Sequence, residues 1–475
     1  MAFTHGTYAS EKESSIKGII TVKNPVVVIG TAPINMGDTT SVNKVELIQS
    51  AKDAVEKFGT SNYIEGFNIT EAIYVALNVF GVTPIVCINV LDPAKHKTEE
   101  TYDSVAVVNK KVTFEHTGIL LNTLVVKKGD TSLPVEEFKA AFEADGKLTI
   151  EIEEEGVSII EGTYSYLDPS KVTDSDIIGS VDPSTMKSTG LECIKDLFTK
   201  YSMIPSYVIT PGYISNELRA VLDTKGSLVG NKWKAMTIVD LPETTKYGEA
   251  ISYKKQNNWI DEDQIVCFGK VRFGGKYYNQ STFAAFLSAS IDNNNDGVPY
   301  ESPSNKNIKA EGISWKNEGN YEDLSLSEEE ANLLNENGIC TIITRSNGTV
   351  FWGNRTSVFQ PGGNTDPKDM WIPAKRMFKY LANTVMLNNE NEVDKPMAIS
   401  KAESIKMNIN RFLSSLVAQE KLLGASIEFT KEDNPTNNLI NGIFTWHINL
   451  GIILPGETLK FILEYDDEHL TAYFG

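Results

Sequence analysis

Residues 24–30 read NPVVVIG and residues 85–90 read IVCINV, and these two short apolar runs decide the class of the fold. Runs of this length and composition are typical of strands that are buried on both faces. Between them lie two segments with apolar residues at helical spacing, at 44–58 and 68–80. Gly59 follows the first segment, as glycine often follows a helix. A strand, two helices and a strand in this order predict an α/β architecture.

The same alternation returns in the middle of the chain, beyond residue 187. Segments with helical spacing separate short apolar runs at 207–210, 234–240, 265–268, 339–344 and 349–352. Such alternation predicts a largely parallel sheet covered by helices. We therefore expect one α/β core built from two separated stretches of the chain.

The intervening stretch, 97–179, follows a different pattern. Apolar and polar residues alternate there, and glycine-containing turns separate the runs, as in antiparallel strands. One helical segment is expected near 134–144. The stretch predicts an inserted β-rich domain, which we expect to be a β-sandwich.

The composition changes again after residue 354. A Pro/Gly/Asn-rich linker leads to predicted helices at 371–387 and 400–422, followed by strand-like runs at 442–454 and 458–465. This order predicts an α+β C-terminal domain. The domains expected from the whole chain are an N-terminal arm (1–20), an α/β core (21–96 and 180–354), the inserted β-rich domain (97–179), a C-terminal domain (355–455) and a C-terminal arm strand (456–475).

Charge and hydropathy exclude several classes of protein. The 475 residues include 44 Lys and Arg against 63 Asp and Glu, a net charge of −19, which disfavours binding to nucleic acid or to an anionic membrane. No run of about 18 apolar residues is present to span a bilayer. Residues 1–18 lack the basic start and apolar run of a secretion signal. We expect a protein that is made and folded in a cytoplasm.

Catalytic and metal-binding motifs fail when their spacing is tested. His5-Gly6-Thr7 resembles the histidine motif of subtilisin-type proteases, but the acid that should precede it is missing. Residues 292–297 (DNNNDG) match the first half of a calcium loop, but Pro303 stands where the bidentate glutamate is needed. We therefore predict no catalytic residue, no cofactor and no metal ligand. The cysteines lack metal-binding spacing and are expected to be small core residues: Cys87, Cys193, Cys267 and Cys340.

The end of the chain carries an unusually apolar strand pattern. Leu459, Phe461, Leu463 and Tyr465 fall on one face of the run at 458–465. A strand of this kind at an open sheet edge promotes aggregation unless another strand pairs with it. Two interpretations stay open: the strand pairs within its own C-terminal domain, or it is donated to a neighbouring subunit.

The predicted helix 371–387 has a basic arc. Lys375, Arg376 and Lys379 lie on one side of the helical wheel, opposite an apolar arc. In an acidic protein, such an arc is a candidate contact for an acidic partner. The alternative is a solvated face opposite a core-facing one.

Several stretches together resemble the contractile tail sheath proteins of phages, phage-tail-like bacteriocins and contractile injection systems. They occur in family order along nearly the whole chain: VVVIGTAP (26–33), SVNKVELIQSAKDAVEKFG (41–59), NITEAIYVALNVFGVTPIVCINV (68–90), VITPGY (208–213), TIVDLP (237–242), DGVPYESPSNK (296–306), NGICTIITRSNGTVFWGNRT (337–356), MWIPAKRMFKYL (370–381) and LLGASIEF (422–429). The stretch at 337–356 is the most specific. Residues 1–10 depart from the Pro-Gly-Val-Tyr start that is common in the family.

The resemblance implies a structural protein and no enzyme. The α/β core would have the subtilisin-like fold without its triad. Subunits would form hexameric rings, stacked helically around an inner tail tube protein, with the helix at 371–387 and its Lys375, Arg376 and Lys379 facing the tube. The arms would pair with C-terminal domains of neighbouring subunits, and baseplate and tail terminator proteins would be further partners. The particle would be a phage tail or a tail-like particle, assembled in the bacterial cytoplasm.

The function expected on this basis is mechanical. The sheath would assemble in a metastable extended state and contract to drive the tube through a target envelope, with energy stored during assembly. Two alternatives are a static shell or scaffold protein and an extracellular multidomain glycan-binding protein or hydrolase. The last class predicts a signal peptide and a convergent carboxylate or metal site, neither of which the sequence displays.

Overall fold

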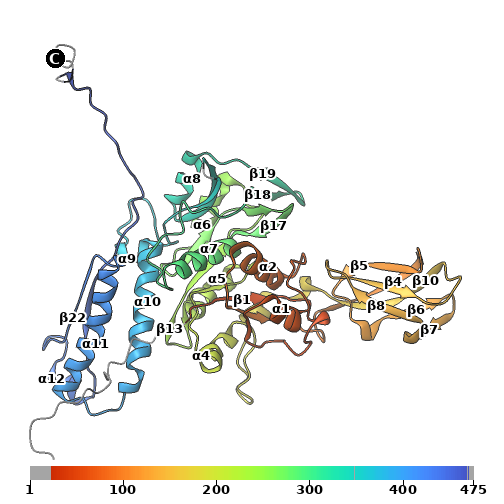
Figure 1. Cartoon of the computed structure of the whole chain (residues 1–475), viewed down its shortest axis with the longest axis horizontal. Coiled ribbons are helices and arrows are strands. Elements are labelled where there is room, and N and C mark those ends of the chain that lie inside the picture. The colour runs from red at the N-terminus through yellow and green to blue at the C-terminus, as the bar shows by residue number, and fades with distance from the viewer. Residues whose placement is uncertain (1–22, 347, 468, 470–475) are drawn as a thin grey trace, which may run out of the picture.

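The computed structural model of the chain describes residues 23–346, 348–467 and 469 (Figure 1). The expected N-terminal arm (1–20) and His5 lie outside these residues. Across the described residues, no helix combines the length and apolarity needed to cross a bilayer. The inserted domain projects from one side of the central α/β core, and the C-terminal helices lie on the opposite side (Figure 1).

An eight-stranded sheet forms the centre of the molecule. In spatial order its strands are β2 (Glu46–Ile48), β3 (Ile85–Asn89), β1 (Val26–Gly30), β11 (Tyr207–Ile209), β14 (Met236–Asp240), β15 (Gln264–Cys267), β20 (Ile339–Arg345) and β21 (Gly348–Trp352). The strands from β3 to β20 are parallel to their neighbours, and the edge strands β2 and β21 are antiparallel. Every residue of β1, β3 and β14 is buried, in agreement with their mainly apolar sequences.

Helices cover the sheet and connect its strands. They are α1 (Ala51–Phe58), α2 (Asn68–Tyr74), α3 (Asp174–Ile178), α4 (Asp196–Tyr201), α5 (Asn216–Val221), α6 (Tyr247–Gln256), α7 (Gln280–Asn294) and α8 (Glu328–Asn335). A π-helical turn, Val75–Phe80, extends α2, so the helix expected at 68–80 is confirmed. The helix expected at 44–58 is partly wrong, because β2 occupies its first part. Ser50 separates the two elements: its side chain accepts a hydrogen bond from the Asp53 N–H and caps α1.

The insert consists of two antiparallel sheets that share one apolar core. One contains β4 (Lys97–Ala106), β10 (Ile159–Leu167), β6 (Val125–Lys128) and β7 (Thr131–Leu133), and the other β5 (Lys111–Thr117), β9 (Lys147–Ile152) and β8 (Phe138–Phe142). The helix expected near 134–144 is wrong: Val135–Glu137 form a single 3-10 turn, and Phe138–Phe142 form β8. Phe138 and Phe142 lie opposite Ile152 and Leu148 of β9, and this pairing overrides the local helical pattern.

Two smaller sheets accompany the core. One is four-stranded, with β17 (Lys276–Asn279), β16 (Lys270–Phe273), β18 (Gly312–Asn317) and β19 (Asn320–Leu324) in that order, and the other is the hairpin of β12 (Leu228–Val229) and β13 (Trp233–Lys234). The strands β16 and β17 follow β15 directly and lead into α7. They therefore lie just beyond the carboxyl end of the parallel sheet, where they help to enclose a cavity described below.

The C-terminal part has its own small core. It contains α9 (Pro367–Met370), α10 (Ile372–Asn389), α11 (Ile399–Ala418), β22 (Gly424–Glu428), α12 (Thr436–Ile440) and β23 (His447–Gly451). Met377 and Leu381 of α10 pack there with Ile409 and Leu413 of α11. In Figure 1, α10 lies between the central core and α11. The mixture of helices and strands agrees with the expected α+β composition, although the strand at 442–454 is shorter than expected.

Candidate assembly surfaces

The last described residues form an exposed, extended arm. Residues 458–465 belong to no strand and pair with no other described segment. Their side chains are almost fully solvated: Phe461 is 86% exposed and Leu463 is 96% exposed. Figure 1 shows this segment running away from the body of the molecule. Large apolar side chains in such a row are costly to leave in water, so the arm has the character of an unpaired strand.

The root of the arm is fixed to the body by one ion pair. Arg355 donates two hydrogen bonds to Glu457, from Nε to Oε1 at 3.2 Å and from Nη2 to Oε2 at 2.5 Å. The guanidinium carbon of Arg355 also lies 3.5 Å from the centroid of the Trp371 ring. A bidentate, stacked arginine defines both position and direction. The arm therefore leaves the molecule from a defined point at the junction of the core and α10.

The C-terminal sheet is small and incomplete. Within the described residues, β22 pairs with β23 alone, so each strand has one unpaired edge. Ile448 and Leu450 of β23 face the apolar core beneath α11 but remain only partly buried. A two-stranded sheet has marginal stability by itself. Additional strands at its edges would bury these side chains and satisfy the free backbone groups.

The predicted basic face of 371–387 is not a free surface, so the expectation that its side chains are exposed is wrong. Lys379 Nζ lies 2.7 Å from Asp263 Oδ1, and Lys375 Nζ lies 2.7 Å from an oxygen of Asp369. Arg376 forms an ion pair with Asp292 of α7. Acidic residues of the same chain therefore neutralise all three cations.

Burial supports the same conclusion. Arg376 is 4% exposed and Lys379 is 7% exposed. Burial lowers the pKa of Lys379, and the attraction of Asp263 opposes that shift only in part. Helical periodicity identified the arc correctly but carried no information about acids supplied by α7 and by the loop before β15. These cations attach α10 to the core.

The apolar residues of the predicted strand at 458–465 are placed as donation to a neighbouring subunit requires. Leu459, Phe461, Leu463 and Tyr465 do not pair within their own C-terminal domain. Sequence reasoning missed Arg355 and Glu457, because an ion pair between residues so far apart leaves no local signal. Among the described residues, no group of His, Cys, Asp and Glu has a geometry that would hold a metal ion.

Comparison with known proteins defines the class. Residues 187–357 match the model of the phage tail sheath protein central domain. The tail sheath protein of Burkholderia phage BcepMu is 26% identical over 500 aligned residues, which cover 100% of this chain and 99% of that protein. The major tail sheath protein of Serratia phage KSP20 is 25% identical over 292 residues, covering 60% of this chain and 70% of that protein.

The fold agrees with these relatives. The sheath of an extracellular contractile injection system (PVC), solved in its contracted state, superposes with a TM-score of 0.58 at 14% identity, covering 98% of this chain and 100% of that one. The mixed α/β fold is thus that of a sheath protein. Residues 187–357 thus carry the central domain of a phage tail sheath protein, and the whole chain is similar to tail sheath proteins; it is a structural subunit of a contractile sheath.

Proposed function

We propose that this subunit polymerises as helically stacked hexameric rings around an inner tail tube, and that neighbouring copies are linked by the arm at 456–475. The observation that carries the proposal is the coexistence of an unpaired apolar arm with an incomplete sheet. A second copy supplies a partner for both, since the unpaired arm of one subunit can add as an extra strand to the incomplete sheet of the next, beside β22 or β23.

The energetics suit a link that persists during movement. A donated strand forms several backbone hydrogen bonds, each contributing ~0.5–1.5 kcal/mol net. Burial of Leu459, Phe461 and Leu463 would contribute about 1.5–3 kcal/mol apiece. The sum is several kcal/mol, so subunits stay joined while their bodies reorient from a metastable extended state to a contracted one. The proposed partners are other copies of the chain, the tube protein, and baseplate and tail terminator proteins, in a phage tail or tail-like particle assembled in the bacterial cytoplasm.

The surface facing the tube needs a different set of side chains from Lys375, Arg376 and Lys379. No described residue of α10 is fully exposed, whereas α11 exposes Met407 and Arg411 on its outer face. We therefore assign the tube contact to the exposed face of α11. The cations of α10 act indirectly, because they hold the C-terminal helices against the core.

The proposed domain boundaries correspond to the separate sheets of the structure. We infer that the α/β core (21–96 and 180–354) is subtilisin-like, that the insert (97–179) is a β-sandwich, and that the C-terminal domain covers 355–455. The shared apolar core of the two insert sheets supports the sandwich. The parallel order from β3 to β20, with helices covering the sheet, supports the core assignment.

Truncation tests the link. Removal of residues 456–475 should leave a folded subunit with unchanged circular dichroism that no longer forms tubes in negative-stain micrographs. A full-length variant with Leu459, Phe461 and Leu463 replaced by Ser should behave in the same way. A matched variant with Lys460→Ser and Glu464→Ser, on the opposite face, should still assemble. Normal tubes from the truncated chain would refute the proposal.

A further inference from the structure

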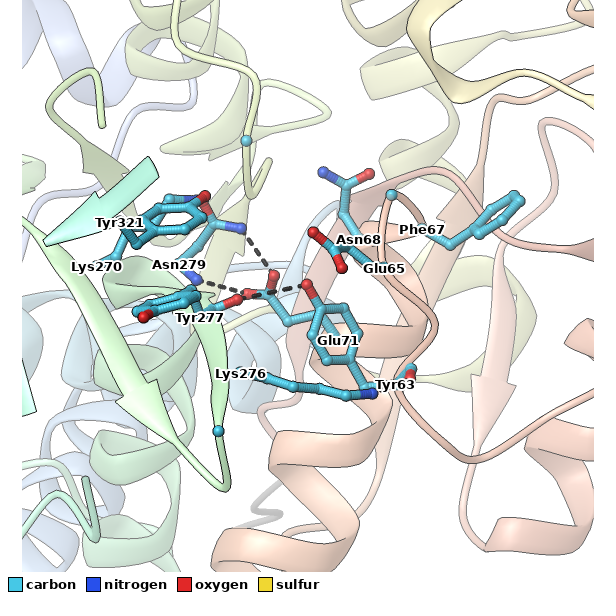
Figure 2. A pocket seen from close by; sticks show the side chains of 13 residues that line it. Tyr63, Glu65, Phe67, Asn68, Glu71, Lys270, Lys276, Tyr277, Asn279 and Tyr321 are labelled. Atoms are coloured by element: carbon cyan, nitrogen blue, oxygen red, sulfur yellow. Dashed lines mark hydrogen bonds between the residues drawn. The ribbon is translucent and has the colours of Figure 1, made fainter. Parts of the chain in front are cut away.

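A cavity of about 440 Å³ opens beyond the carboxyl end of the central sheet (Figure 2). Asn68 lies at its edge, between the ends of β1 and β11. Its Oδ1 accepts a hydrogen bond from Thr31 Oγ1 at 2.6 Å, just after β1, and its Nδ2 donates to the carbonyl oxygen of Pro211, just after β11. The chain leaves β1 toward β3 on one side of the sheet and returns at β11 on the other. Open α/β sheets bind ligands in the crevice at such a reversal of strand order.

A buried carboxylate forms the floor of the cavity. Glu71 is 2% exposed and accepts hydrogen bonds from the backbone N–H of Asn279 at 2.9 Å, from Asn279 Nδ2 at 2.8 Å and from Thr282 Oγ1 at 2.7 Å. A carboxylate has about four acceptor positions, so one remains for a group inside the cavity. Burial is expensive for such a group, and an apolar residue would fill the floor at lower cost. The arrangement therefore resembles a built binding site more than a packing defect.

Aromatic side chains form one wall. Tyr277 and Tyr321 are stacked, with ring centroids 4.1 Å apart and an interplanar angle of 19°. Figure 2 shows this pair on one side of Glu71, with Asn68 and Glu65 on the other. The cavity thus combines aromatic surface with amide, hydroxyl and carboxylate groups.

The charges that line the cavity oppose one another. Glu65 and the ionised form of Glu71 disfavour an anionic ligand, while Lys270 and Lys276 disfavour a cationic one. Lys270 already has partners: its Nζ forms an ion pair with Glu243 Oε2 at 3.3 Å and donates a hydrogen bond to Asn279 Oδ1 at 2.8 Å. What remains is a mixture of hydrogen-bond donors and acceptors beside tyrosine rings, without a dominant charge.

We propose that this cavity binds a neutral polyhydroxylated ligand, namely a sugar residue, free or within a glycan. Sugar hydroxyls both donate and accept, so they match carboxylate, amide and ammonium groups at the same time. The apolar C–H face of a sugar ring matches the tyrosine wall. The volume lies within the range of ~300–1,000 Å³ that is usual for small-molecule sites. The proposal does not depend on the role of the arm in assembly.

Saturation-transfer NMR on the unassembled full-length chain tests the site. The probes are N-acetylglucosamine, its β-1,4-linked tetramer and, as a zwitterionic control, glycylglycine. At ~10 mM, a site with a Kd of ~1 mM is mostly filled. We expect transfer to at least one sugar and none to glycylglycine.

Variants locate the binding. Lys276→Met and Tyr277→Ala should each weaken sugar binding by roughly tenfold, the effect of losing one good polar contact. Lys276 is exposed, so its replacement leaves the fold intact. Lys255→Met, at an exposed lysine of α6, is the matched control and should have no effect. Absence of transfer to both sugars, transfer to glycylglycine, or undiminished sugar binding by Lys276→Met would each overturn the proposal.

Discussion

Arg376 of α10 and Asp292 of α7 form an ion pair in the interior of the protein, between the central core and the C-terminal helices. The Arg376 guanidinium also lies 4.8 Å from the centroid of the Tyr207 ring on β11. Further along α10, the side-chain amide of Asn383 bonds both the N–H and the carbonyl oxygen of Lys234. The helix is therefore attached to the core at several points along its length. We expect α10 to move with the core as one body when the sheath contracts.

Loss of the buried cation should destabilise the subunit strongly. Arg376→Ala leaves Asp292 buried without a partner, and breaking a buried pair in this way costs about 3–5 kcal/mol. Urea unfolding of the unassembled chain measures the change. Arg411→Ala, at an exposed position of α11, should change the free energy of unfolding by less than about 0.5 kcal/mol. Equal effects of the two substitutions would contradict the structural role of Arg376.

Charge reversal separates the two roles assigned to basic residues. Lys379→Glu places a carboxylate beside Asp263 and should lower the free energy of unfolding of the subunit. Arg411→Glu should leave that free energy unchanged and weaken co-assembly with the tube, as measured by co-sedimentation. If Arg411→Glu subunits decorate tubes normally, α11 is not the contact.

The pair of Arg355 and Glu457 should control how the arm is presented. Exposed or partly exposed ion pairs contribute up to ~1 kcal/mol, so Arg355→Ala should leave the subunit folded. It should increase protease cleavage within the arm and slow polymerisation several-fold, because the root is no longer fixed. A variant with Arg355→Glu and Glu457→Arg should recover part of the rate, whereas each single reversal should not. Identical assembly rates for wild type and Arg355→Ala would exclude the constraint.

Two buried acids should give the subunit a stability that declines with pH. Burial raises the pKa of Glu71 from 4.5 to about 7 and that of Asp240 from 3.8 to about 6. Each pKa is higher in the folded state, so the unfolded chain releases its protons first as pH rises. The contribution of these two acids to the free energy of unfolding is therefore complete below their unfolded pKa values. It is lost as pH rises through their folded pKa values.

Thermal unfolding of the unassembled chain between about pH 5 and about pH 8 measures this decline. Glu71→Gln should flatten the profile by up to ~3 kcal/mol, although it sacrifices the bond from Asn279 Nδ2 at every pH. Glu65→Gln, at an exposed carboxylate, is the matched control. A Glu71→Gln profile as steep as that of the wild type would show that Glu71 is not perturbed as described.

The elements that could be predicted from sequence are those whose signals are local. The apolar runs at 26–30 and 85–89 became central strands, and the apolar face at 459–465 marked the unpaired arm. The errors arose where distant residues decide the outcome. Residues 138–142 have a helical pattern but form β8, because they pair with β9. The cations of α10 are not free, because they form ion pairs with acids of α7 and of the loop before β15. The cavity around Glu71 was also invisible, because its walls come from segments about 200 residues apart.

We propose that the arm completes the C-terminal sheet of another subunit, and a cryo-EM reconstruction of the assembled sheath, at a resolution that traces the backbone, tests this pairing. Residues 458–465 should be hydrogen-bonded to the free edge of β22 or β23 in a neighbouring copy, with Phe461 and Leu463 buried. An arm that pairs solely within its own chain, or that lies unpaired in the polymer, would contradict the proposal.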